Sequence, residues 1–144
     1  MKKLALAAVL FVAAGACSSV SPRPIRAGEL CFRCKRVIVD TRVAAQTIDG
    51  GLASNFRSPG CVARYLAGHP SEQSVVFVTD YESSKLVPVA SAVFVQTLNR
   101  DTGEVDFAAY TDQKAAAIEA AKRNTSPVAW AAVLDWGRSA ERGN

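Results

Sequence analysis

The sequence is poor in two residue types that commonly bind metals or carry out acid–base chemistry. Among its 144 residues the only histidine is His69 and the only methionine is Met1. A serine-hydrolase triad needs a histidine that is oriented by a carboxylate, and a single histidine in a predicted turn offers no such arrangement. Any chemistry in this chain must therefore rest mainly on its other side chains.

A dense positive surface is also missing. The formal net charge is +4, but Lys2 and Lys3 supply two of these charges and residues 1–16 contain no acidic residue. The rest of the chain has 15 basic and 13 acidic side chains, a net charge of +2. This balance excludes the basic face of a typical nucleic-acid binder. With 49% hydrophobic residues, the remaining length suits one compact domain or two very small ones.

No apolar run is long enough to span a membrane. Residues 4–16 are apolar, but a spanning helix needs about 20 residues. A basic start, this run, and small residues directly before Cys17 resemble a bacterial lipoprotein signal. We predict that residues 1–16 are removed and that Cys17 carries lipid, which anchors the chain in the bacterial envelope facing the periplasm. Ser18 favours the outer membrane; plain secretion with cleavage after Ala16 is the alternative.

Hydrophobic patterning predicts an α+β fold. We expect strands at 37–39, 43–48, 52–56, 75–78, 105–110 and 129–134, an extended run at 86–95, and helices at 59–68 and 113–123. Each half reads strand, strand, helix, strand, which indicates duplicated units that share one core. The predicted segments are a signal peptide (1–16), a lipidated tether (17–27), a first unit (28–83), a second unit (84–137) and a tail (138–144).

The residues with the clearest chemical meaning are three cysteines in the first unit. Cys31 and Cys34 form a Cys-x-x-Cys pair, and Cys61 falls in the first turn of a helix that Ser58 caps. A two-thiol turn, a hairpin and a helix that begins with a thiol follow the layout of a treble-clef metal site. The helix N-terminus should lower the pKa of Cys61. Neither Ser58 nor Arg64, three residues on either side of Cys61, is a suitable fourth ligand.

Three thiols without a fourth ligand favour Cu(I), a soft ion that accepts two or three sulfur atoms. Structural Zn²⁺ prefers four ligands and stays an alternative. His69 would follow Cys61 by eight helical residues, or about 12 Å, too far for both to bind one ion. In an exported protein, disulfide formation or thiol redox chemistry at Cys31 and Cys34 is the competing interpretation. A structural lipoprotein without metal is the third.

The order of these motifs resembles the NosL-type lipoproteins, accessory proteins of nitrous-oxide reductase. The residues that carry the resemblance are Cys31 and Cys34; Ile38, Asp40, Ala44, Ala45 and Gln46; Phe56, Gly60, Cys61, Tyr65 and Leu66; residues 78–81; and Ala90, Val93, Phe94 and Val95. It implies a non-enzymatic, periplasm-facing lipoprotein of duplicated α+β units that binds Cu(I) and delivers it to a client cuproenzyme or another copper carrier. Lys35 and Arg36 replace the family's Gly-Met, and residues 99–103 replace its Pro-Met-Gly segment. We therefore expect copper to rest on Cys31, Cys34 and Cys61 alone.

Overall fold

A computed structural model describes residues 19–143. The predicted signal peptide and Cys17, the predicted lipidation site, lie outside these residues. Over the described range, no helix has both the length and the apolar character that a bilayer crossing requires. The α+β prediction is confirmed, since α-helices and two antiparallel sheets make up the fold.

The helices and strands follow one another along the chain in a simple order. Their bounds are η1 Thr41–Val43, β1 Ala45–Asp49, β2 Leu52–Phe56, α1 Pro59–Gly68, β3 Val75–Thr79, β4 Leu86–Pro88, η2 Val89–Ser91, β5 Val93–Leu98, β6 Val105–Tyr110, α2 Gln113–Ala121 and α3 Trp130–Arg142. The run predicted as extended at 86–95 is thus divided by the short helix η2.

The first sheet has the order β2-β1-β3-β4, with all neighbours antiparallel. Gly50 and Gly51 turn the β1–β2 hairpin with φ values of 53° and 84°, a backbone conformation that glycine adopts readily. β4 lies at the edge, where Pro88 is tolerated because an edge strand does not need every N–H group. This strand belongs to the second unit of the prediction but pairs with β3 of the first.

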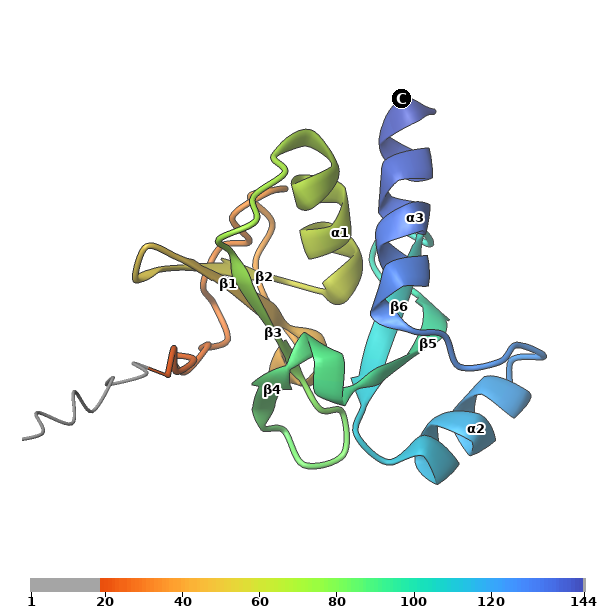
Figure 1. Cartoon of the computed structure of the whole chain (residues 1–144). Coiled ribbons are helices and arrows are strands. Elements are labelled where there is room, and N and C mark those ends of the chain that lie inside the picture. The colour runs from red at the N-terminus through yellow and green to blue at the C-terminus, as the bar shows by residue number, and fades with distance from the viewer. Residues whose placement is uncertain (1–18, 144) are drawn as a thin grey trace, which may run out of the picture.

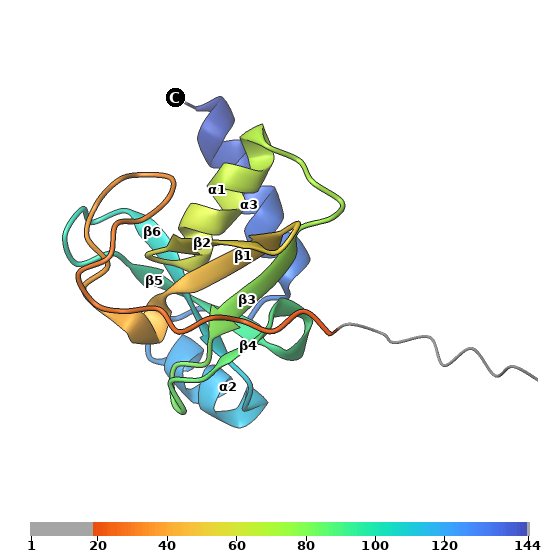
Figure 2. The same cartoon turned by 90° about the vertical axis from the view of Figure 1, so that its left-hand side faces the viewer.

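The second sheet is the β5–β6 hairpin, which a parallel bridge between Asp80 and Ala109 joins to the end of β3. Figures 1 and 2 show α1 between the four-stranded sheet and α3, with the β5–β6 hairpin beside it. One buried cluster takes side chains from both halves of the chain, including Phe56, Phe94 and Val133. Helix α1 is therefore held from several sides, which fixes the position of its first turn.

The strand predicted for residues 129–134 is wrong. Val128 makes one antiparallel bridge with Phe94, and the chain then turns into α3, which also takes up most of the predicted tail. The apolar run at 129–134 is compatible with a strand or a helix. The helical spacing of apolar residues becomes visible only when the sequence is followed further along α3. Trp130, Val133 and Gly137 are three and four residues apart and lie on the inner face.

Helix α3 packs closely on α1, and Gly137 makes this possible. A Cβ atom at Gly137 would lie 2.7 Å from the backbone carbon of Ala63, an atom that cannot move aside. We predict that Gly137→Ala lowers the free energy of unfolding by about 2 kcal/mol, the cost of overpacking a core. Gly68→Ala, at the end of α1, meets open space and should not destabilise the fold. Urea unfolding of both variants tests this; equal midpoints would contradict the close packing.

Part of the predicted tether lies against the folded core. The amide N–H of Arg23 donates to the side-chain oxygen of the buried Gln46 at 2.8 Å, and Gln46 donates back to the Arg23 carbonyl at 3.0 Å. Ile25 packs against the main buried cluster. The free part of the tether between Cys17 and the domain is therefore shorter than residues 17–27.

Candidate metal centre

The first two cysteines lie on a tight turn. Leu30 and Val37 form an antiparallel bridge, and the amide of Cys31 donates to the Arg36 carbonyl at 2.8 Å. Lys35 adopts φ 59°, a left-handed conformation that costs a side chain more than it costs glycine. This short ribbon replaces the strand expected at 37–39.

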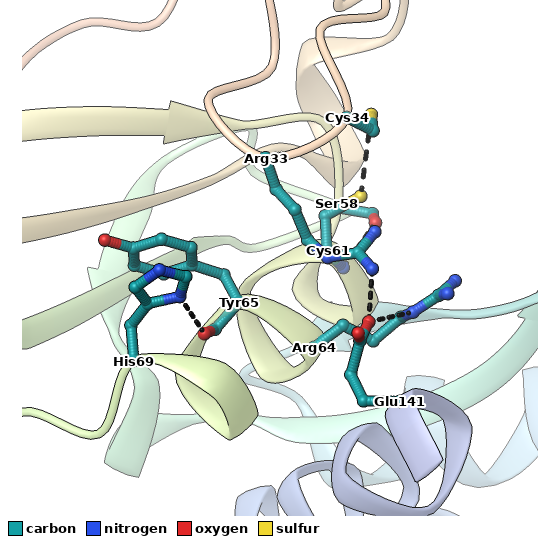
Figure 3. Close-up of polar contacts among 8 residues, drawn as sticks. All are labelled: Arg33, Cys34, Ser58, Cys61, Arg64, Tyr65, His69 and Glu141. Carbon is teal, nitrogen blue, oxygen red and sulfur yellow. Dashed lines mark hydrogen bonds and ion pairs between the residues drawn. The ribbon is translucent and has the colours of Figure 1, made fainter. Parts of the chain in front are cut away.

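The third cysteine begins α1 as the sequence predicted. The Ser58 hydroxyl oxygen accepts from the amide of Cys61 at 3.1 Å, and Pro59 occupies the first turn. The Sγ atoms of Cys61 and Cys34 are 4.0 Å apart, and Figure 3 shows them facing each other. All three Sγ atoms, with that of Cys31, lie within 4.8 Å of one another. The structure thus brings the three predicted ligands together.

The thiols differ in their access to solvent. Cys31 is completely buried and Cys61 is 8% exposed, whereas Cys34 is only partly buried. None of the three is in a disulfide. The cluster is therefore a group of three unpaired thiols, of which Cys34 is the most accessible to solvent.

The pKa values of the two buried thiols move in opposite directions. The neighbouring Cys61 thiol stabilises the thiolate of Cys31; burial opposes this, and backbone amides of Cys34 and Arg57 add to it, so that the pKa of Cys31 falls to about 4. The Cys31 side chain and burial raise the pKa of Cys61. The lowering expected for Cys61 from its helix N-terminus is therefore wrong.

The first N–H groups of α1 bind oxygen atoms. The buried carboxylate of Asp106 accepts from the amide of Gly60 at 3.1 Å, and the Ser58 hydroxyl accepts from the amide of Cys61. A Cβ atom at Gly60 would lie 2.5 Å from the Asp106 carboxylate oxygen, so this contact requires glycine. The helix N–H groups next to Cys61 are thus directed at oxygen atoms rather than at sulfur.

Arg57 is a buried cation beside the cluster, and the sequence did not indicate this burial. Its residue is 9% exposed, and its Nε atom has no hydrogen-bond partner. Its nearest ion-pair contact is 3.9 Å long, to the exposed Asp101. Burial opposes its charge, but Cys61 and Cys34 offset this and raise the pKa of Arg57. A buried cation without a full set of partners needs negative charge nearby, and a thiolate in the cluster provides it.

A second feature that sequence reasoning missed connects the Cys turn to α1 and α3. Arg33 and Arg64 both bind Oε1 of Glu141, with Arg64 at 2.9 Å, and Figure 3 shows the two guanidinium groups meeting at this carboxylate. Partial burial opposes ionisation of Glu141, but hydrogen bonds from Arg64 and the charge of Arg33 lower its pKa. Only the packing of α3 could reveal this contact, because 108 residues separate Arg33 from Glu141.

His69 is outside the cluster, in agreement with the distance expected along α1. It caps the end of the helix, its ring stacks on Tyr65 at 4.4 Å, and its Nδ1 atom is 3.1 Å from the Tyr65 carbonyl oxygen. Figure 3 shows it well away from Cys61. A Cys3His site is therefore not formed in this structure.

The lowered pKa of Cys31 predicts how stability depends on pH. Between about pH 4 and the ordinary thiol value of 9.0, the folded chain holds one proton fewer than the unfolded chain at Cys31. Its contribution to stability therefore grows as pH rises through this range and is lost as pH falls to about 4. Urea unfolding of the reduced, metal-free protein at two pH values in this window should show the gain, and Cys31→Ser should remove it. An identical pH dependence in the two proteins would contradict the assignment.

The three thiols, the buried guanidinium of Arg57 and the bridging Glu141 together form a small, ordered centre. Its sulfur atoms have the spacing of a metal site: bonds of about 2.3 Å to a central ion place three planar ligands about 4.0 Å apart. The Cys34–Cys61 separation of 4.0 Å already meets this value.

No protein-family model, curated protein or solved structure matches the chain.

Proposed function

We propose that the protein is a membrane-anchored, periplasm-facing carrier of Cu(I) that supplies the metal to a client cuproenzyme or to another copper carrier. The observation that carries the proposal is the group of three reduced sulfur atoms, Cys31, Cys34 and Cys61, within 4.8 Å of one another. A Cys turn, the β1–β2 hairpin and the start of α1 support a treble-clef-like arrangement, and the lipoprotein-like leader supports the anchor.

The ligand set favours Cu(I) over Zn²⁺. Zinc in structural sites takes four ligands, whereas Cu(I) is stable with two or three thiolates. Among residues 19–143, no histidine or carboxylate belongs to the group of close metal-ligating atoms that these three cysteines form. Zn²⁺ with a water ligand remains the alternative that a metal competition would reveal.

The differences in burial among the cysteines suggest how the metal enters and leaves. Cys31 and Cys61 would hold the ion from inside, and the partly exposed Cys34 would be the ligand that an incoming thiol or thioether replaces. Exchange through one exposed ligand lets the ion stay bound to sulfur throughout. Arg57 and the Arg33–Glu141–Arg64 contact would keep the three sulfur atoms in place.

A Cu(I) titration against a competing chelator tests the proposal. The parent protein should bind one equivalent, and the triple variant Cys31→Ser/Cys34→Ser/Cys61→Ser should bind none at the same chelator concentration. If the triple variant binds as tightly as the parent, the metal site is wrong. Parallel titration with Zn²⁺ distinguishes the two metals.

A thiol redox function is the second candidate, because a thiolate at Cys31 stands close to the accessible thiol of Cys34. Transfer of two electrons to an incoming disulfide would leave a Cys31–Cys34 disulfide. A free-thiol count on the protein purified from the bacterial envelope separates the functions. Three free thiols with bound copper favour the carrier, one free thiol without metal favours redox exchange, and three free thiols without affinity for metal favour a structural lipoprotein.

A further inference from the structure

The ribbon that bears the first two cysteines has an unusual outer face. Leu30 and Val37 pair directly, so their side chains lie on one face, and Val39 follows two residues later on that same face. These three are 59%, 48% and 73% exposed, whereas Cys31 and Ile38, which point inward, are fully buried. We call Leu30, Val37 and Val39 the outer ribbon face. An outward face on a solvated protein is usually polar, so these apolar side chains need a reason.

The exposed charges next to this face are mostly positive, and the acidic Asp40, which follows Val39, is paired with Arg42 at 2.8 Å. Lys35 and Arg36 at the tip of the ribbon and Arg26 before it are exposed. The one acidic residue of the ribbon, Glu29, is half-buried and accepts a hydrogen bond from Asn55 at 2.5 Å. A surface with an apolar centre and a cationic rim complements a partner with an apolar centre and an acidic rim.

The outer ribbon face and the most accessible of the three thiols belong to the same ribbon. Cys34, the partly exposed thiol, lies in the turn of the same ribbon, next to Lys35. A partner seated on this face would therefore bring its own ligands within reach of the Cys34 sulfur. The partner would therefore dock on the same ribbon whose Cys34 exchanges the metal.

We propose that the outer ribbon face, with Lys35 and Arg36, is the docking surface for the acidic face of a protein that exchanges Cu(I) with Cys34. This inference rests on the proposed function and names the chemistry of its partner. An anionic lipid surface is disfavoured because it would cover the Cys34 sulfur and cannot take up the ion. A second copy of the chain is disfavoured because a symmetric contact would bring Lys35 and Arg36 against the same cations.

Two synthetic peptides serve as probes for the partner. Both carry the same Met-x-x-Met segment between leucines, with glutamates around it in one and lysines in the other. We expect the loaded full-length protein to pass Cu(I) to the acidic peptide at least about tenfold faster at low salt, through electrostatic steering. The advantage should shrink as salt screens the charges.

Two variants and a matched control locate the effect. Lys35→Glu/Arg36→Glu should abolish the preference for the acidic peptide, and Val37→Ser/Val39→Ser should slow transfer to both peptides. Lys85→Glu/Lys114→Glu changes the net charge equally at exposed positions elsewhere and should keep the preference. Equal rates for both peptides in the parent, or the same loss in the control pair, would overturn the proposal.

A metal-free measurement keeps this test separate from the proposed function. Addition of the acidic peptide to the reduced apoprotein should shift the amide NMR signals of Leu30, Val37 and Val39, while those of α2 stay unchanged. A protein that shows these shifts but binds no Cu(I) would refute the carrier function and keep the docking surface. Shifts of the same amides with phosphatidylglycerol vesicles alone, or a concentration-dependent dimer that buries them, would assign the face to another occupant and overturn the proposal.

Discussion

Replacing Cys31 with serine lowers the affinity for Cu(I) by more than about a hundredfold. Loss of a residue that only supports a metal ligand typically costs tenfold to hundredfold, so loss of a ligand should cost more. Cys31 is the proposed ligand whose pKa falls to about 4 and the one completely removed from water. The hydroxyl of serine stays protonated at neutral pH and is a poor partner for a soft ion. A competition titration under reducing conditions gives the ratio of the affinities.

The fourth cysteine of the chain supplies the control. Cys17→Ser also removes one thiol, but we predict that lipid covers this residue, so the affinity for Cu(I) should not change. The result for Cys34→Ser is informative too, because two buried sulfur atoms, Cys31 and Cys61, would remain to bind Cu(I) in two-coordinate form. The prediction fails if Cys17→Ser and Cys31→Ser have equal effects, or if Cys31→Ser binds as tightly as the parent.

The cluster itself could be predicted because its determinants are local. The spacing of Cys31 and Cys34 requires a turn, and the Ser58-Pro59 cap places Cys61 in the first helical turn. Only the short β1–β2 hairpin lies between the Cys31–Cys34 turn and Cys61. Because this connection is short, it keeps the three thiols close together. Turns and helix caps of this kind depend on neighbouring residues, so they can be predicted without knowledge of the rest of the fold.

The surroundings of the cluster could not be predicted, because they depend on contacts between distant parts of the chain. Asp106 reaches the N-terminus of α1 from β6 and accepts from the amide of Gly60. The pKa values of Cys31 and Cys61 move apart because folding buries these two distant side chains against each other. Glu141 comes from a helix that the sequence analysis took for a strand and a tail. A run such as residues 129–134 is apolar at every position, so strand and helix compete until the packing of Val133 and Gly137 decides.

Replacing Arg57 with glutamine should weaken Cu(I) binding tenfold to hundredfold without removing a ligand. Three thiolates bring more negative charge into the pocket than one Cu(I) neutralises, and the buried guanidinium offsets part of the excess. Glutamine keeps much of the side-chain volume but has no charge. Arg57→Lys restores the charge on a side chain that donates from a single point, and it should recover part of the affinity. Competition titrations of the three proteins give the comparison.

An effect of charge can be separated from an effect of folding. The Nε atom of Arg57 has no partner in the metal-free protein, so loss of this group should cost the fold little and could even stabilise it. Affinity and stability should then respond differently: Arg57→Gln lowers the affinity for Cu(I) while the urea midpoint of the apoprotein stays near that of the parent. Arg36→Gln removes an exposed charge two residues from Cys34 and should change neither quantity. If Arg57→Gln unfolds the apoprotein, or leaves the affinity unchanged, Arg57 is a structural residue and the charge of the loaded centre is balanced in another way.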